Sequence, residues 1–141
     1  MREMAADLEF VERHPGYDTL NNPRRLTVAE LMPIGLTWRS GGVRREVTSQ
    51  AGVAGRLLGD ASGIAVVEAP YDLATNCAYI VNADGSLRAR IPAQIGADRV
   101  AFYDVIDSGG SVAFLAAAQG KDLRIEIRET DGAVVRVEES R

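Results

Sequence analysis

The second half of this chain alternates short runs of strand-forming residues with clusters rich in Gly and Asp. The clearest example is Asp84-Gly85, which separates the apolar run Cys77 to Asn82 from the run Ser86 to Ile91. Asp and Gly both tolerate the positive φ angles of tight hairpin turns. Further clusters of this kind occupy residues 107–110, 119–122 and 129–132. This spacing predicts consecutive antiparallel strands joined by short turns.

The predicted strands of this half are 64–69, 77–82, 86–91, 99–106, 112–118, 123–128 and 133–138. Leu123, Ile125 and Ile127 alternate with charged residues, which indicates one buried and one wet face. Leu87, Ala89 and Ile91 follow the same pattern, and we expect them to point inward.

Two of these runs are apolar on both sides, and each therefore needs cover on both faces. They are 77–81 and 112–118, which reads Val-Ala-Phe-Leu-Ala-Ala-Ala. A helix over residues 111–119 is an alternative because Ala and Leu favour helices. The β-rich surroundings favour a strand.

The first half is less regular. Thr27 and Glu30 match a capping box, and Pro33 limits the helix that follows to one or two turns. We also expect a strand at 8–11, a hairpin from strands 36–39 and 43–47, and a loop over 49–63 with room for one short strand. The overall prediction is a single mainly β domain over residues 1–141. It has an irregular part, 1–70, and a regular antiparallel meander, 71–141, that forms a sandwich or partly closed barrel, with one short helix near residues 27–33.

Composition excludes several classes of protein. No apolar run approaches the ~20 residues that a membrane-spanning helix needs. The acidic start and the single cysteine, Cys77, predict a cytoplasmic protein without an internal disulfide. The net charge is −4, unevenly spread: six Arg and two acidic residues between Arg24 and Arg56 give +4, and the rest of the chain carries −8.

Two serine motifs are candidates for catalysis. Asp107-Ser-Gly-Gly110 resembles the nucleophile segment of trypsin-like proteases, and Gly59-Asp-Ala-Ser-Gly63 is close to the hydrolase pattern G-x-S-x-G. Both reactions need a His base, but the one His of the chain, His14, precedes Pro15-Gly16 in a predicted turn. We interpret both motifs as turns. One His and one Cys also exclude the usual zinc sites, and we predict neither a metal nor a cofactor.

Other functions remain open. Glu68 and Asp104 lie among apolar residues, and a pair of such carboxylates would suit general acid catalysis. Strands with two apolar faces could also line a cavity for a small molecule. Trp38 beside Arg39 has the composition of a single-strand nucleic-acid platform. The acidic chain argues against that function, and a core position for Trp38 is the simpler interpretation.

The run Thr75 to Ile91, which contains Asn82-Ala-Asp-Gly-Ser-Leu-Arg88, together with Phe102-Tyr-Asp104, resembles immunity proteins of bacterial contact-dependent inhibition and polymorphic toxin systems. The resemblance covers about residues 75–104. It implies a small non-enzymatic β-protein that neutralises a cognate protein toxin by occluding its active site. A basic nuclease toxin would complement the acidic part of this chain.

Four residues are the candidate partner contacts: Tyr71, Asp72, Trp38 and Arg39. Tyr71 and Asp72 follow Pro70 in a predicted loop. Trp, Tyr and Arg carry much of the binding energy in protein interfaces. The alternative is that Tyr71 and Trp38 belong to the core.

Overall fold

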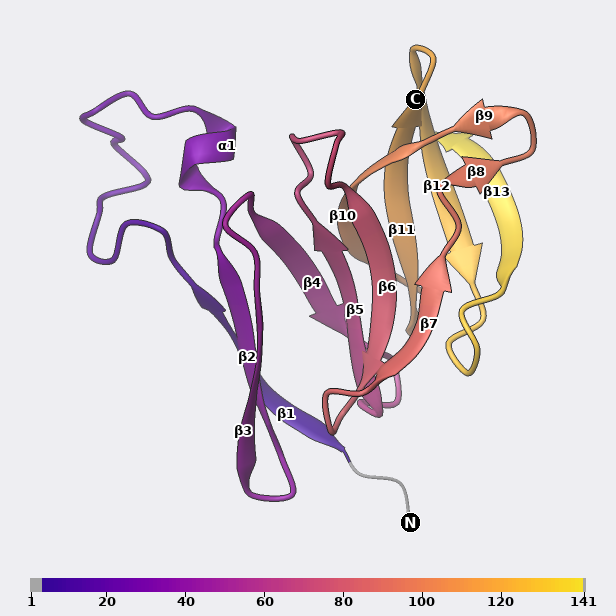
Figure 1. Cartoon of the computed structure of the whole chain (residues 1–141), viewed down its shortest axis with the longest axis horizontal. Coiled ribbons are helices and arrows are strands. Elements are labelled where there is room, and N and C mark those ends of the chain that lie inside the picture. The colour runs from indigo at the N-terminus through magenta and orange to yellow at the C-terminus, as the bar shows by residue number, and fades with distance from the viewer. Residues whose placement is uncertain (1–3, 141) are drawn as a thin grey trace.

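The computed structural model describes residues 4–140, and their strands form three stacked antiparallel sheets (Figure 1). The first sheet contains β1 (Ala5–Val11), β2 (Gly35–Ser40) and β3 (Val43–Thr48). The second contains β4 (Val53–Leu57), β5 (Gly63–Glu68), β6 (Cys77–Asn82) and β7 (Leu87–Ile91). The third contains β10 (Ala101–Ser108), β11 (Ser111–Ala118), β12 (Lys121–Ile127) and β13 (Val134–Ser140). A small hairpin of β8 (Gln94–Ile95) and β9 (Asp98–Arg99) precedes the third sheet, and the short helix α1 (Val28–Leu31) precedes β2.

The middle sheet is covered on both faces. Ile64 and Val66 face the first sheet, where they join a core with Trp38 of β2. Ala65 and Val67, which alternate with them, face the third sheet. Because successive side chains of a strand point to opposite faces, β5 serves two cores at once. The predicted mainly β, sandwich-like architecture is confirmed, and the sheets do not close into a barrel.

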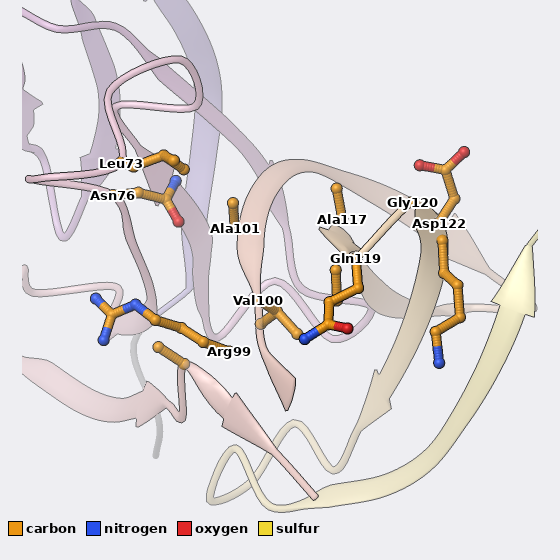
Figure 2. A pocket seen from close by; sticks show the side chains of 12 residues that line it. Leu73, Asn76, Arg99, Val100, Ala101, Ala117, Gln119, Gly120 and Asp122 are labelled. Carbon is orange, nitrogen blue, oxygen red and sulfur yellow. The ribbon is translucent and has the colours of Figure 1, made fainter. Parts of the chain in front are cut away.

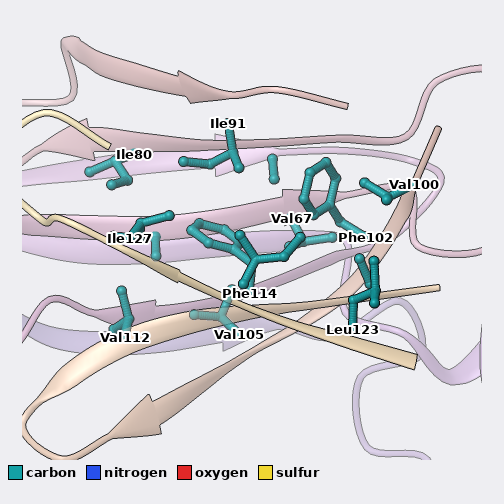
Figure 3. Close-up of a cluster of buried hydrophobic side chains, with 14 of the residues drawn as sticks. Val67, Ile80, Ile91, Val100, Phe102, Val105, Val112, Phe114, Leu123 and Ile127 are labelled. Atoms are coloured by element: carbon teal, nitrogen blue, oxygen red, sulfur yellow. The ribbon is translucent and has the colours of Figure 1, made fainter. Parts of the chain in front are cut away.

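The larger core lies between the second and third sheets (Figure 3). Phe102 of β10 and Phe114 of β11 are fully buried there, with ring centroids 6.1 Å apart in an edge-to-face arrangement. Burying each side chain of this kind contributes about 1.5–3 kcal/mol. Residues 111–118 form strand β11 and not a helix, because they pair with β10 on one side and with β12 on the other. The expected cover is present on one face, where Phe114 is buried, whereas on the other face Leu115 is only partly buried and Ala117 is exposed.

The predicted helix is confirmed as a single turn. Thr27 Oγ1 accepts a hydrogen bond from the Glu30 amide at 3.1 Å, and Glu30 Oε1 accepts one from the Thr27 amide at 3.1 Å. This is the expected capping box. Within residues 4–140, no helix has the length and apolar character needed to cross a membrane.

Two details of the sequence interpretation need correction. The boundary at Pro70 does not separate an irregular part from a meander, because β5 and β6 pair across it with Glu68 opposite Cys77. The strand predicted over 99–106 is interrupted at Val100, which lies between β9 and β10.

The prediction that Leu87 points inward is also wrong. Ile80 pairs with Ala89 and Val81 pairs with Leu87, so Arg88 is the extra residue of a β-bulge. The bulge leaves Leu87 half exposed. It aims the Arg88 guanidinium at the carbonyl oxygens of Ser62 and Glu129, at 3.1 and 3.0 Å, and at Asn82 Oδ1, at 2.6 Å.

Candidate protein-binding surface

Loops from all three layers meet at the end of the molecule that carries α1 (Figure 1). They are residues 12–34, the β5–β6 loop 69–76, the segment 92–100 with the β8–β9 hairpin, and the β11–β12 turn at 119–122. We call these segments the loop rim.

A groove of about 580 Å³ opens in the loop rim between the β5–β6 loop, the β8–β9 hairpin and the β11–β12 turn (Figure 2). Val100, Ala101 and Ala117 give it an apolar wall, and charges of both signs lie around that wall, from Arg99, Lys121 and Asp122. It is open to solvent, unlike the enclosed cavity expected of a dedicated small-molecule carrier.

A second hollow of about 460 Å³ lies on the other side of the β5–β6 loop. It is lined by Arg13 and His14 of the loop after β1, by Glu30 of α1, and by Tyr71 and Asp72. The β5–β6 loop therefore forms a ridge between two hollows.

Large apolar side chains are exposed on this rim. Leu20 is 95% exposed and Leu73 is 71% exposed, and Val28 and Tyr71 are also largely in solvent. Single exposed apolar residues are ordinary on protein surfaces. Four of them lie at one end, and two of these, Leu73 and Tyr71, line the two hollows, which is typical of an interaction surface.

Asn76 fixes the base of the ridge. Its Nδ2 donates to the carbonyl oxygens of Glu68, Ala69 and Phe102, at 3.2, 3.2 and 2.7 Å. Its Oδ1 accepts from the Phe102 amide at 2.9 Å. The loop that presents Tyr71 and Leu73 is thus anchored to β10 at Phe102, whose ring is fully buried.

The structure separates the four predicted contact residues. Tyr71 and Asp72 lie side by side in the loop rim. Trp38 is 1% exposed, and its indole N–H donates to the Ala83 carbonyl at 2.8 Å, so the alternative that Trp38 belongs to the core is correct and its candidacy as a partner contact is wrong. Arg39 is exposed on β2 near the β2–β3 turn, at the opposite end from Tyr71.

The sequence interpretation missed Leu20, Val28, Leu73 and Asn76. A usable signal was present for Leu73, because an isolated leucine in the polar, turn-rich stretch Tyr71 to Asn76 has no strand neighbours with which to be buried. The sequence gives no comparable signal for Asn76, because its anchoring role depends on a hydrogen bond to Phe102, 26 residues away.

The Glu68 carboxylate accepts a hydrogen bond from a residue on the neighbouring strand of its own sheet. Tyr79 donates its hydroxyl to Glu68 Oε2 at 2.5 Å. Burial and this hydrogen bond raise the pKa of Tyr79 far above its usual value. Burial also raises the pKa of the nearby Cys77 thiol, consistent with an unreactive side chain.

Asp104 is exposed, and its Oδ1 accepts from the adjacent Val105 amide at 2.8 Å. The two candidate carboxylates thus have different partners, and neither lines the two hollows of the rim. Within residues 4–140 no cluster of three or more His, Cys, Asp and Glu has the arrangement of a metal site.

The two serine motifs form turns that pack against each other. A β-carbon at Gly59 would lie 1.9 Å from the Gly110 carbonyl oxygen, so this contact requires glycine. The Gly59 amide donates to the Glu129 carboxylate at 3.1 Å, and Ser111 Oγ lies 3.1 Å from the same carboxylate. Ser62 lies beside Asp60 and Arg88, with no imidazole among its hydrogen-bond partners.

No protein-family model matches this chain. A comparison with curated proteins also finds no match. Among solved structures, a chain from the structure of Tne2 in complex with Tni2 has a TM-score of 0.77 and 18% sequence identity. The match covers 98% of this chain and 100% of that chain. At this identity, the likeness shows that the two chains share a fold.

Proposed function

We propose that this chain is an immunity protein that binds a cognate protein toxin through the loop rim. The observation that carries the proposal is the exposure of Tyr71 and Leu73 on the ridge, where each lines one of the two hollows. Leu73 and Tyr71 would act as anchors, and the charged residues around them would form the polar border of the interface.

The structural comparison supports this role. The matched chain comes from the structure of Tne2 in complex with Tni2, so a chain of this fold has been observed in a complex of two proteins, as an immunity role requires. The sequence resemblance of residues 75–104 to immunity proteins points to the same role, although it depends on different residues from those of the rim.

The proposed mechanism is steric and needs no catalytic group. The ridge would insert into a cleft on the toxin surface. If that cleft is the active site, the inserted ridge would exclude the substrate of the toxin. The charge of −8 outside residues 24–56 would speed association with a basic toxin, such as a nuclease, in the cytoplasm.

The experiment is co-expression with a cognate toxin, which we expect to be encoded by a neighbouring gene. The wild-type chain and Leu87→Asp should restore growth, and Leu73→Asp should not. Leu87 is the matched control because it is a half-exposed leucine in the β6–β7 hairpin, at the opposite end of the molecule. Equal protection by both variants, or a purification from the native host that yields no tight protein partner, would overturn the proposal.

Small-molecule binding is the second candidate, because the groove of about 580 Å³ has an apolar wall, although it is more open than the cavity of a dedicated carrier. A wild-type chain that purifies with a bound metabolite, and loses it when Ala117 is changed to a bulky Leu, would support this function. If the groove instead binds the toxin, the same change of Ala117 to Leu should weaken the affinity of the protein for the toxin.

A further inference from the structure

β13 is an edge strand of the third sheet. It pairs with β12 on one side, and its other side has no strand partner among the described residues. Val135, which a register shift leaves without a partner on β12, is largely exposed, and Val137, in the regular part of the ladder, is 39% exposed. An unpaired edge with exposed valines is a template for pairing with another strand.

The outer face of β12 and β13 carries alternating charges. Arg124 and Glu126 lie on β12, and their direct partners across the ladder are Glu138 and Arg136 of β13. Each cross-strand pair therefore joins opposite charges, which stabilises neighbouring strands. Arg136 and Glu138 are also ion-paired with each other at 2.5 Å.

The charge order of β13 is complementary to itself. In an antiparallel pair of two β13 strands with Val137 opposite Val137, Arg136 of each copy would face Glu138 of the other. Registers centred on Arg136 or Glu138 would instead place like charges opposite each other. We propose that a second copy of this chain pairs with β13 in the register centred on Val137, so that two third sheets become one continuous sheet.

The apolar face supports the same register. Val137 lies opposite the fully buried Ile125 on the inner face of the sheet. In the dimer, Val137 of the second copy would pack against Val137 of the first across the symmetry axis. This contact would continue the apolar inner face of the sheet and cover Val137, which is partly exposed to water in a single copy. Such a twofold contact is isologous, so it closes at a dimer.

Three other edge strands, β1, β3 and β7, are less suitable. β1 is interrupted between Ala6 and Glu9, with Asp7 at a φ of 58°. On β3, Arg45 lies against the turn at Gly85. On β7, a pairing centred on Ala89 would oppose Arg88 and Arg90, which carry like charges.

Cross-linking tests the register directly. In a Cys77→Ala background, Val137→Cys would place two thiols across the axis with Cα atoms about 4.5–5.5 Å apart, within disulfide range. Val135→Cys is the control, because that residue would face Glu139 and lie about 13 Å from its own copy. We expect rapid disulfide dimers from Val137→Cys and slow ones from Val135→Cys. Equal rates would overturn the proposed register.

Charge exchange tests the pairing without a covalent bond. By analytical ultracentrifugation over a concentration series, the wild-type chain should dimerise. Arg136→Glu and Glu138→Arg should each self-associate about tenfold more weakly. Mixed together, the two variants should form a heterodimer, because every cross-axis pair is then opposite in charge. A monomeric wild-type chain, or a mixture no more associated than its components, would overturn the proposal.

The proposed dimer contact through β13 does not involve the loop rim. Leu73→Asp should leave self-association unchanged, and Arg136→Glu should leave toxin neutralisation unchanged. The two proposals therefore fail separately.

Discussion

Asn76 and Phe102 exchange two hydrogen bonds between one side chain and one backbone unit. The Asn76 amide nitrogen donates to the Phe102 carbonyl at 2.7 Å, and its oxygen accepts from the Phe102 amide at 2.9 Å. The Asn76 side chain thereby takes the place of a strand partner beside β10. The Phe102 ring is buried against Phe114, so the ridge of the loop rim is attached to the main core.

Asn76→Ala should therefore lower stability by about 1–3 kcal/mol, because it leaves the Phe102 amide and nearby carbonyls without partners. Urea unfolding followed by circular dichroism measures this loss. Asn21→Ala is the control, since Asn21 bonds only within its exposed loop, to Asp18. Faster hydrogen exchange across residues 69–76 should accompany the loss. An unchanged urea midpoint would contradict the anchoring role.

Arg88→Lys should cost about 2 kcal/mol. The guanidinium joins Ser62, Asn82 and the Glu129 carbonyl, and a lysine ammonium cannot make this set of bonds in the same geometry. Arg90→Lys, on the exposed side of the same strand, should change stability by less than about 0.5 kcal/mol. Equal unfolding free energies for the two variants would show that the bulge needs no guanidinium.

Trp38 is the only tryptophan of the chain, and it reports on the smaller core. Its fluorescence should be blue-shifted in the native state and move to longer wavelength on unfolding. Trp38→Phe leaves the Ala83 carbonyl without its donor and should cost about 1–3 kcal/mol. Tyr71→Phe, at an exposed side chain, should cost little. Native emission at the wavelength of free tryptophan would contradict the buried position.

Asp131 should titrate at low pH. The Arg128 side chain, followed by the Ala133 amide, lowers the pKa of Asp131 from 3.8 to about 2. Because the folded pKa lies below the unfolded one, the contribution of this carboxylate is complete above about pH 4 and is lost as the pH falls toward 2. A carboxyl-carbon NMR titration measures the midpoint. Arg128→Ala should raise it toward 3.8, and a midpoint that this variant leaves unchanged would contradict the assignment.

Much of the β architecture follows from local sequence. The turns at Asp84, Asp107 and Asp131 and the capping box depend on residues close together in the chain. The apolar character of 77–81 on both faces also predicted a layered fold, and the second core against Trp38 supplies the expected cover.

The errors have a common origin in contacts between distant segments. Arg88 forms a bulge because its hydrogen-bond partners are Ser62 and Glu129. The alternation of apolar and charged residues along 87–91 gives no information about those partners. Trp38 is buried because the Ala83 segment covers it, 45 residues away. The loop rim likewise depends on stacking three sheets, so sequence alone could place Tyr71 and Asp72 in a loop but could not bring Leu20 to the same end.

The most direct test of the proposed function is the affinity for the cognate toxin of Leu73→Asp compared with Leu87→Asp, measured by calorimetry. A buried interface anchor contributes about 2 kcal/mol or more, so Leu73→Asp should weaken binding by at least about 30-fold. Leu87→Asp should bind like the wild-type chain. Equal affinities for the two variants, or a loss confined to Leu87→Asp, would contradict binding through the loop rim.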